Sequence, residues 1–516
     1  MSKTMVEEIA TIKNIRRDSL LSKKVKKALL IFPPCFTSTK ILDVNPLPPL
    51  GLAYIGAILE KRGVEVKIFD CLAEGFDKQV FVPEYNLYRI GSSFEEIKKL
   101  IEDFQPDMVG VNNIFSLQRH NAHEVYRITK MVNPEIITVA GGAHPTSMPE
   151  LVISDGDVDF VVLGEGEGAF EELLEGLEGR KDFETIDGIG FQRNGTIKIN
   201  PKTKFVDDVD ALPFPARHLL NWDKYYGLEV SHGVRSRRKF SPIVTSRGCP
   251  AKCTFCSAYK VWGRAFRARS PENVIAEMKE MIEKFGIEEI VFEDDNLTLD
   301  PKRAERIFDL MVEEKLNLVW DTPNGVAGWT LTPELLDKMK ASGCVRLNFP
   351  IESANPEVLK HIIRKPLKLE KVGPLVEHAR KIKLPIGFFF VIGMPGETED
   401  QIWDSYRFAR KHGVYNPHVS IATPYPGTEL YEIALKNNYL REGYTMDDLF
   451  IRSFPISTPE ISREKLKQIF DAGQRYMLMS YIQDRPFEVM KKFIVKLFTN
   501  PKAIYKRFCQ LSIKTI

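Results

Sequence analysis

SRGCPAKCTFC, residues 246–256, brings together three of the seven cysteines in this 516-residue chain. Cys249, Cys253 and Cys256 follow the spacing C-x3-C-x2-C and stand directly after a predicted strand over 241–247. Three thiolates on one loop can hold three irons of a [4Fe–4S] cube, which leaves one iron open to a reaction partner. The alternative is a zinc knuckle, which usually needs a fourth Cys or His at matching spacing. None follows within thirty residues, so the sequence favours the iron–sulfur cluster.

Strands and helices alternate regularly from residue 241 onward. The predicted strands are 241–247, 288–294, 317–323, 345–352, 386–393 and 418–423. Six consecutive βα units predict a partial (β/α)6 barrel, and the active site of such a barrel lies at the carboxyl ends of its strands. The last stretch of about 75 residues shows no strand pattern and is predicted to be helical.

The first half of the chain alternates in the same way. Its predicted strands are 28–35, 64–71, 107–113, 135–140 and 159–163, and its predicted helices are 50–62, 94–104 and 117–132. This order predicts an α/β domain with a doubly wound, Rossmann-like parallel sheet. Ligands of such sheets bind beyond the carboxyl ends of the strands, and glycines at these ends let a bulky group approach the backbone.

These patterns divide the chain into five parts. They are an N-terminal tail or helix (1–27), the Rossmann-like domain (28–180), a linker (181–239), the partial barrel (240–440) and a helical C-terminal region (441–516). The linker is inferred from the turn-rich stretch Leu212-Pro213-Phe214-Pro215.

Composition limits the classes of protein that the chain can represent. Seventy-two Lys and Arg residues against 70 Asp and Glu residues give a net charge of +2, so the overall charge does not point to nucleic acid. Seven cysteines are too few for a disulfide scaffold. No apolar run reaches the length of about 18 residues that spans a membrane, and the N-terminus is charged where a signal peptide would be apolar. We therefore expect a protein of the reducing cytoplasm with no nucleic-acid partner.

The cysteine loop at the start of a partial barrel resembles the radical S-adenosylmethionine (SAM) superfamily. Strand ends at Glu293-Asp294-Asp295, Ile351-Glu352-Ser353 and Phe390–Gly396 resemble its SAM-binding elements in the same order. The resemblance implies that Cys249, Cys253 and Cys256 ligate a [4Fe–4S] cluster whose open iron binds SAM. It also implies that the cluster, reduced by a partner such as flavodoxin or ferredoxin, cleaves SAM to a 5′-deoxyadenosyl radical. The implied SAM contacts are Phe255, Glu293, Asp294, Glu352, Ser353 and Gly393.

Three stretches of the first half resemble the cobalamin-binding domain that is fused to one large radical SAM subfamily. They are residues 47–54 (LPPLGLAY), 141–146 (GGAHPT) and 158–167 (VDFVVLGEGE). The implied cobalamin contacts are Leu50, Gly51, Asn113, Gly142, His144, Pro145, Thr146, Gly164, Glu165 and Gly166. Many such domains carry D-x-H-x-x-G, whose histidine ligates cobalt, but the nearest stretch here, around His123, lacks both the aspartate and the glycine. We therefore expect no protein histidine on the cobalt.

The resemblance implies a B12-dependent radical SAM enzyme, and we expect a C-methyltransferase that acts on an unactivated carbon of a small, hydrophobic or lipid-like molecule. A radical SAM cyclase or C–C bond-forming enzyme with the same cofactors remains open. A cobalamin-binding sensor or carrier with a vestigial barrel is an alternative of another class, although the intact cluster cysteines argue against it. A methylthiotransferase is disfavoured because the first half offers only Cys35 and Cys71 for a second cluster. The sequence assigns no catalytic acid or base.

The C-terminal tail is basic and amphipathic. Residues 485–516 contain eight Lys or Arg residues and a single acidic residue, Glu488. Apolar residues recur at helical spacing, at Phe487, Met490, Phe493, Ile494, Leu497 and Phe498. A helix of this kind either lies on an anionic membrane surface or packs its apolar face on the barrel with its lysines in water. The first alternative would place the protein at the inner face of the membrane.

Overall fold

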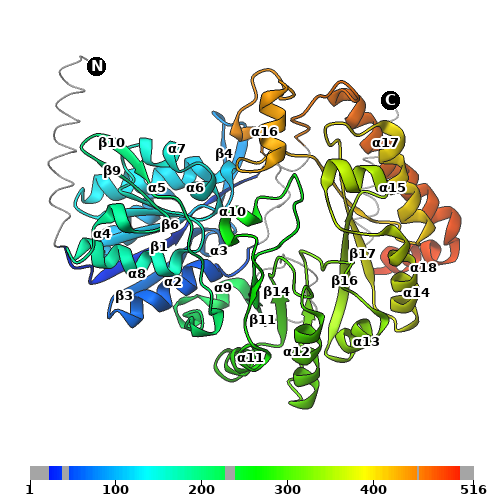
Figure 1. The fold of residues 1–516 in the computed structure, drawn as a ribbon, viewed down its shortest axis with the longest axis horizontal. Helices are drawn as coiled ribbons and strands as arrows, with labels where there is room; N and C mark the ends of the chain where they lie inside the picture. Colours follow the sequence, from blue (N-terminus) through cyan, green and yellow to red (C-terminus); the bar gives the residue numbers. More distant parts are fainter. Residues whose placement is uncertain (1–22, 38–45, 227–238, 450–452, 500–516) are drawn as a thin grey trace.

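The computed structural model describes residues 23–37, 46–226, 239–449 and 453–499. In these ranges the chain forms two largely parallel sheets, each flanked by helices, followed by a pair of C-terminal helices (Figure 1). The α/β class that the sequence predicts is therefore confirmed. Most of the predicted N-terminal segment, residues 1–22 of 1–27, lies outside the described residues.

The first sheet has seven strands in the order β10-β9-β8-β7-β6-β1-β3. Its five parallel strands are β1 (Lys27–Phe32), β3 (Glu65–Asp70), β6 (Met108–Asn112), β7 (Ile137–Gly141) and β8 (Phe160–Val162). The chain adds β3 on one side of β1 and then β6 on the other, so the strand order reverses beside β1. The crevice at such a reversal is the usual ligand site of this fold. The doubly wound, Rossmann-like sheet is thus confirmed.

Helices cover both faces of the first sheet (Figure 1). On one face α2 (Leu50–Lys61) packs against α8 (Gly166–Leu177). On the other face α4 (Phe94–Phe104) packs against α5 (Arg119–Val132). α4 begins where the sequence predicts because Ser93 and Glu96 form a capping box. Buried aliphatic side chains from the strands and the inner helix faces form the core of this half.

The structure differs from the predicted linker over 181–239. Its first part forms β9 (Ile189–Arg193) and β10 (Thr196–Ile199), an antiparallel hairpin that pairs with β8 and widens the first sheet. The hairpin forms because Asn194 and Gly195 take positive φ angles, 50° and 75°, which suit a two-residue turn between twisted strands. A small antiparallel sheet was also not predicted. It consists of β2 (Cys35–Thr37), β4 (Gln79–Val82) and β5 (Leu87–Ile90).

The second sheet contains six parallel strands in the order in which the chain makes them. They are β11 (Phe240–Ile243), β14 (Glu289–Phe292), β15 (Val319–Asp321), β16 (Cys344–Glu352), β17 (Ile386–Ile392) and β18 (His418–Ile421). The helices that follow these strands are α11 (Pro271–Phe285), α12 (Pro301–Glu313), α13 (Pro333–Ala341), α14 (Val372–Lys381), α15 (Glu399–Lys411) and α16 (Glu429–Lys436). This arrangement confirms the partial (β/α)6 barrel.

Two short strands and a short helix are inserted between the strand and the helix of the first βα unit of the barrel. β12 (Ser246–Arg247) pairs antiparallel with β13 (Arg267–Ala268), and α10 (Ala258–Trp262) lies between them in the chain. The cysteine stretch is thus held on a loop between β12 and α10. Thr254, in the middle of this loop, is bonded to segments that follow later barrel strands.

The C-terminal region is helical, as predicted, over α17 (Arg463–Asp484) and α18 (Pro486–Thr499). α17 packs on α15, and its buried face includes Leu466, Phe470 and Met477. Residues 500–516, which belong to the predicted basic tail, lie outside the described ranges. Among the described residues, no helix is long and apolar enough to cross a membrane.

Candidate cofactor site between the two sheets

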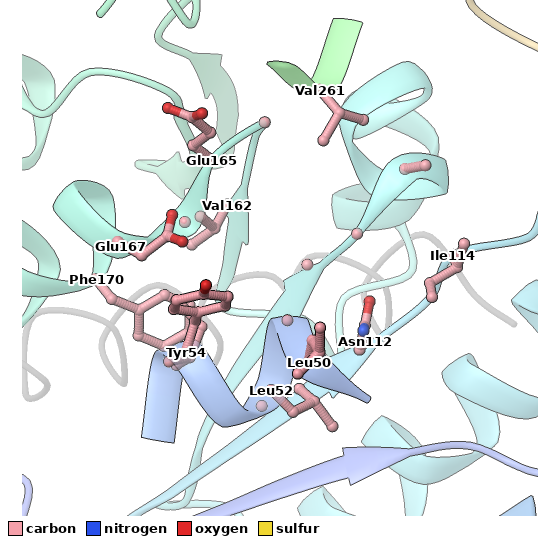
Figure 2. Close-up of a pocket in the computed structure, with 18 of the residues that line it drawn as sticks. Leu50, Leu52, Tyr54, Asn112, Ile114, Val162, Glu165, Glu167, Phe170 and Val261 are labelled. Atoms are coloured by element: carbon pink, nitrogen blue, oxygen red, sulfur yellow. The ribbon is translucent and has the colours of Figure 1, made fainter. Parts of the chain in front are cut away.

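A cavity of about 320 Å³ lies at the carboxyl ends of the first sheet and reaches the start of the second (Figure 2). The second half of the chain contributes Val244, Arg247, Val261 and Trp262 to its wall. Of the predicted cobalamin contacts, six line the cavity: Leu50, Gly51, Gly142, Gly164, Glu165 and Gly166. The other four, Asn113, His144, Pro145 and Thr146, are not among the lining residues. Asn112 lines the cavity in place of its neighbour Asn113.

A ligand can approach the backbone closely here because several lining positions lack side chains. A Cβ atom at Gly141 would meet no protein atom within 4 Å, so it would project into the cavity. Gly142 has a φ of +107°, and a Cβ atom there would lie 2.6 Å from Oδ1 of Asn112, so only glycine fits. Ile55 and Phe170 help to make the inner wall apolar. An apolar slot with exposed backbone at its edge fits part of a large cofactor such as cobalamin.

Thr146 joins the loops that carry Gly142 and Gly164, and neither Thr146 nor His144 lines the cavity. Thr146 donates from Oγ1 to the carbonyl oxygen of Gly142 at 2.8 Å and accepts from the N–H of Gly164 at 2.9 Å. The buried His144 ring has its Nδ1 2.9 Å from Oγ of Ser116. Burial lowers the pKa of His144 to about 3, so the ring is neutral. Among the described residues no histidine lines the cavity, and a cobalt free of protein histidine stays a prediction.

Arg247, which the sequence analysis does not single out, joins the two halves of the chain at the cavity. Its Nη2 lies 2.6 Å from Oε1 of Glu167, and its Nη1 lies 3.4 Å from Oε1 of Glu165. The guanidinium lies 5.3 Å from the centre of the Tyr54 ring and 4.9 Å from that of Trp262. Burial alone would raise the pKa of Glu167, but the guanidinium outweighs burial and holds that pKa below its usual value. A fixed positive charge therefore stands between the cavity and the cysteine loop.

The cysteine loop is fixed by backbone bonds to later parts of the barrel. Thr254 donates from its N–H to the carbonyl oxygen of Ile363 at 3.1 Å, and its own carbonyl oxygen accepts from the N–H of Leu430 at 2.9 Å. Ile363 follows β16 and Leu430 follows β18, so the loop lies at the carboxyl ends of the barrel strands. Gly248 opens the loop with a φ of +84°, and a Cβ atom there would lie 2.2 Å from the carbonyl oxygen of Ala265. Only glycine therefore fits directly before the first cysteine.

The three thiols of this loop have surroundings that fit an iron–sulfur cluster. The N–H groups of Ala251 and Ala258 donate to the sulfurs of Cys249 and Cys256, and hydrogen bonds to sulfur are typical of such clusters. Burial raises the pKa of all three thiols, that of Cys253 to about 12, so a metal is needed to deprotonate them. In the described part of the chain, no three His, Cys, Asp or Glu side chains are placed to hold one metal ion. This spacing of the thiols is compatible with a [4Fe–4S] cluster, because each cysteine there binds a different iron.

Charges of both signs face the cysteine loop. Burial is the largest cause that raises the pKa of each thiol. The charge of Lys365 lowers the pKa of all three thiols, and the charge of Asp295 raises the pKa of Cys249 and Cys256. Nζ of Lys365 lies 2.9 Å from Oε1 of Glu352, and the two side chains are 7% and 9% exposed. Glu352 has a φ of 69°, a strained value for this residue type, and such strain clusters at functional sites. An ammonium group beside carboxylates suits a zwitterion such as the amino-acid part of SAM.

Lys365 belongs to no predicted SAM-binding element, whereas Asp295 lies in the predicted stretch 293–295 without being named as a contact. The individually named contacts have different surroundings in the structure. Glu293 lies at the end of β14, where its Oε2 accepts from Nδ2 of Asn324 at 2.9 Å and burial raises its pKa to about 8. Ser353 is buried at the end of β16. Phe255 packs in a small apolar cluster beside the cysteine loop.

Gly393 marks the turn after β17. Its N–H donates to Oε2 of Glu397 at 2.7 Å, and the N–H of Met394 donates to the same oxygen at 3.2 Å. Glu397 is fully buried, and burial raises its pKa to about 8. This carboxyl group, which no sequence motif indicates, accepts both bonds from inside the turn.

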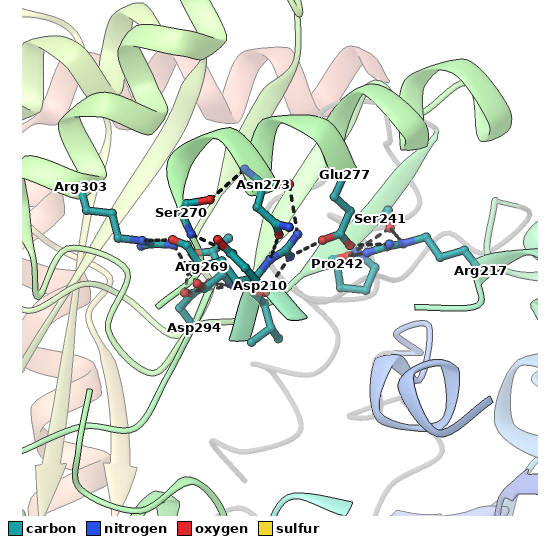
Figure 3. Close-up of polar contacts among 12 residues, drawn as sticks. Asp210, Arg217, Ser241, Pro242, Arg269, Ser270, Asn273, Glu277, Asp294 and Arg303 are labelled. Atoms are coloured by element: carbon teal, nitrogen blue, oxygen red, sulfur yellow. Dashed lines mark hydrogen bonds and ion pairs between the residues drawn. The ribbon is translucent and has the colours of Figure 1, made fainter. Parts of the chain in front are cut away.

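Asp294 is engaged inside the protein, and its contact with SAM stays a prediction. Its carboxylate accepts from the N–H and Oγ1 of Thr245, the latter at 2.7 Å, and from the hydroxyl of Ser246. Arg303 donates to the carbonyl oxygen of Thr245 at 2.7 Å. Figure 3 shows Asp294 in a buried polar network with Arg269 and Arg303. A buried carboxylate needs such donors, and here they fix the backbone that leads into the cysteine loop.

Comparisons with known proteins agree with this site. The model of the B12 binding domain matches residues 44–174, and that of the radical SAM superfamily matches residues 243–409. The chain is 35% identical over 454 residues to the cytidylyl-2-hydroxyethylphosphonate methyltransferase of Streptomyces wedmorensis, which covers 81% of this chain and 83% of that protein. It is also 35% identical over 418 residues to an uncharacterized methyltransferase of Pyrococcus horikoshii, which covers 81% of this chain and 85% of that one.

A solved structure shares the fold. TsrM, a radical SAM methyltransferase from Kitasatospora setae with cobalamin and a [4Fe–4S] cluster bound, matches with a TM-score of 0.63 at 18% identity. The match covers 81% of this chain and 79% of that chain. The two family models and the two relatives at 35% identity show that this chain belongs to the B12-binding radical SAM enzymes.

Proposed function

We propose that this chain is a B12-dependent radical SAM C-methyltransferase. The position of Arg247 supports this most directly, because Arg247 lines the cavity that we assign to cobalamin and stands two residues before Cys249. Cobalamin in the cavity and a cluster on the loop would therefore be close neighbours. A methyl carrier beside a source of radicals is what methylation of an unactivated carbon needs. The two relatives at 35% identity are both named methyltransferases.

Different residues of the site would hold the cluster, SAM and cobalamin. When bound, the cluster, SAM and cobalamin supply the radical chemistry and the methyl group. Cys249, Cys253 and Cys256 would ligate the cluster. Lys365 would pair with the carboxylate of SAM and Asp295 with its amino group, because these two side chains present opposite charges to the cysteine loop. The buried apolar wall of the cavity keeps water away from the bound cofactor.

The methyl acceptor in this proposal is an unactivated carbon of a hydrophobic, lipid-like small molecule. The support for this substrate class is the set of exposed apolar side chains on α18, among which Phe487 is 80% exposed. A small redox protein such as flavodoxin or ferredoxin would supply the electrons, since each cleavage of SAM consumes one.

Cleavage of SAM tests the proposal. Anaerobically reconstituted protein should convert SAM to 5′-deoxyadenosine in the presence of dithionite, as measured by mass spectrometry. Cys253→Ala should lose both the product and the iron–sulfur chromophore. Cys344→Ala is the matched control, because Cys344 is a buried thiol of the barrel core, and it should retain both. Product from Cys253→Ala at the normal rate would contradict the assignment.

Methyl transfer separates the proposed enzyme from its alternatives. Reduced protein with bound cobalamin should take a deuterated methyl group from labelled SAM and form methylcobalamin. A cyclase would cleave SAM and leave cobalamin unmethylated, and a cobalamin sensor would do neither. Absence of labelled methylcobalamin would therefore refute the methyltransferase proposal even if SAM is cleaved.

A further inference from the structure

The last described helix, α18, contacts its neighbour α17 through two polar side chains. Oη of Tyr481 on α17 lies 3.4 Å from Oε2 of Glu488 and 2.8 Å from Nζ of Lys492. The Lys492 ammonium also lies 5.1 Å from the centre of the Tyr481 ring. Glu488 and Lys492 are one turn apart on the helix, so they share one side of it. Both side chains therefore contact α17 at Tyr481 but stay exposed, and Val489 beside them is partly buried.

The apolar side of α18 points away from the protein. Phe487, Met490 and Ile494 repeat at helical spacing and are 80%, 54% and 45% exposed. At 3.6 residues per turn they centre roughly 150° around the helix axis from Glu488 and Lys492. α17 adds three further exposed apolar side chains, namely Leu478, Met479 and Ile482. Figure 1 places both helices at the outer edge of the molecule.

The exposure of these apolar side chains is unusual for such a helix. A surface helix of a globular protein normally turns its apolar stripe inward and its charged side to water. Among the residues that the structure describes, nothing covers the stripe of Phe487, Met490 and Ile494. Contiguous exposed apolar surface of this kind marks a site of interaction with another molecule or with a membrane.

The charge of the segment selects the partner. Residues 485–516 hold eight Lys or Arg residues and one acidic residue. A second copy of this chain would bring the same positive charge to the stripe, and residues 500–516 of the same chain would do so as well. An anionic surface would instead be attracted. We propose that α18 binds the surface of an anionic lipid bilayer, with Phe487, Met490 and Ile494 between the acyl chains and the basic side chains against the headgroups.

Sedimentation with vesicles tests the membrane contact. The full-length, cofactor-loaded protein should sediment with vesicles of phosphatidylcholine and phosphatidylglycerol, and high salt should weaken this binding. The triple variant Phe487→Ser/Met490→Ser/Ile494→Ser should bind at least about tenfold more weakly, which corresponds to about 1.4 kcal/mol. Met131→Ser is the matched control, because Met131 is an exposed methionine on α5 of the other half, 63% exposed, and it should bind as the wild type does.

Further measurements decide between a bilayer and the other occupants. Lys491→Glu should reduce binding to the anionic vesicles, and vesicles of phosphatidylcholine alone should bind weakly at best. A wild-type dimer that the triple variant converts to monomer, with no vesicle binding by either, would overturn the proposal in favour of a second copy. Loss of vesicle binding on deletion of 500–516, with full binding by the triple variant, would also overturn it. The triple variant should still cleave SAM, so failure of the membrane contact is distinct from failure of the proposed enzyme.

Discussion

Replacing Gly141 by valine should block cobalamin without disturbing the fold. A Cβ atom at this position meets no protein atom within 4 Å, and the residue lines the cavity of about 320 Å³, so the new isopropyl group would occupy space that the ligand needs. Gly141 ends β7, where a β-branched residue is well tolerated. We therefore expect the free energy of unfolding to change by less than about 0.5 kcal/mol.

The effect on binding follows from overpacking. Extra carbon atoms in a filled, close-packed site cost about 1–3 kcal/mol, which corresponds to cobalamin binding that is about 5- to 140-fold weaker. Titration of the cobalamin absorbance against protein measures this affinity directly. Gly168→Val is the control, because a Cβ atom at Gly168 also meets nothing within 4 Å but Gly168 lies on the exposed side of α8. Equal affinity of Gly141→Val and the wild type would refute the assignment of the cavity.

Four further changes test other parts of the site. Lys365→Gln should weaken SAM binding about tenfold or more, since a hydrogen bond to a charged group contributes about 1.5–3 kcal/mol. Loss of the positive charge should also lower the midpoint potential of the cluster. Equilibrium dialysis measures the first effect and an electron paramagnetic resonance titration the second, and unchanged values in both would count against the role of Lys365. Arg247→Ala leaves the buried Glu167 without its counter-ion, while Glu165 keeps its ion pair with Arg267 at 2.7 Å. The variant should reduce the free energy of unfolding by about 3–5 kcal/mol, and a loss below about 1 kcal/mol on denaturant unfolding would be inconsistent with the pairing. The pKa of Glu397 is raised from 4.5 to about 8, so the folded state holds a proton that the unfolded chain releases and stability falls as pH rises between these values. Glu397→Gln keeps the acceptor and should make that fall shallower, with the remainder due to Glu293, whose pKa is also raised to about 8; unfolding curves at several pH values would show the difference. Paramagnetic spectra of bound cob(II)alamin should lack nitrogen hyperfine splitting from protein and should be the same in His144→Ala; splitting that disappears in this variant would show that the histidine reaches the cobalt.

Local signals in the sequence were enough to predict both sheets. Apolar runs, helical spacing and caps act over a few residues, so β17 and α4 fall within one residue of their predicted ranges. The hairpin of β9 and β10 was missed although Asn194 and Gly195 are a strong turn signal, because turn-rich residues further along suggested a linker. The order of the barrel strands followed from the repeated βα unit alone.

The partners of individual side chains could not be predicted in the same way. Arg247 meets Glu167, which lies 80 positions earlier, and only the packing of the two halves brings them together. Lys365 lies far beyond the cysteines in the chain and belongs to no local pattern. Asp294 stands at a strand end where a ligand contact is expected, yet the nearest donors belong to the protein. Sequence position thus indicated the region of the site. Which partner each polar side chain contacts depends on the tertiary structure.

The ion pairs of Arg247 also bear on how such proteins can be recombined. A fragment that ends between the two sheets would retain Glu165 and Glu167 but lose the guanidinium that neutralises them, and the complementary fragment would carry an orphan cation. Exchange of one half for that of a distant relative would meet the same mismatch unless both sides of the contact were transferred. The two halves are therefore expected to be inherited, and to unfold, as one unit.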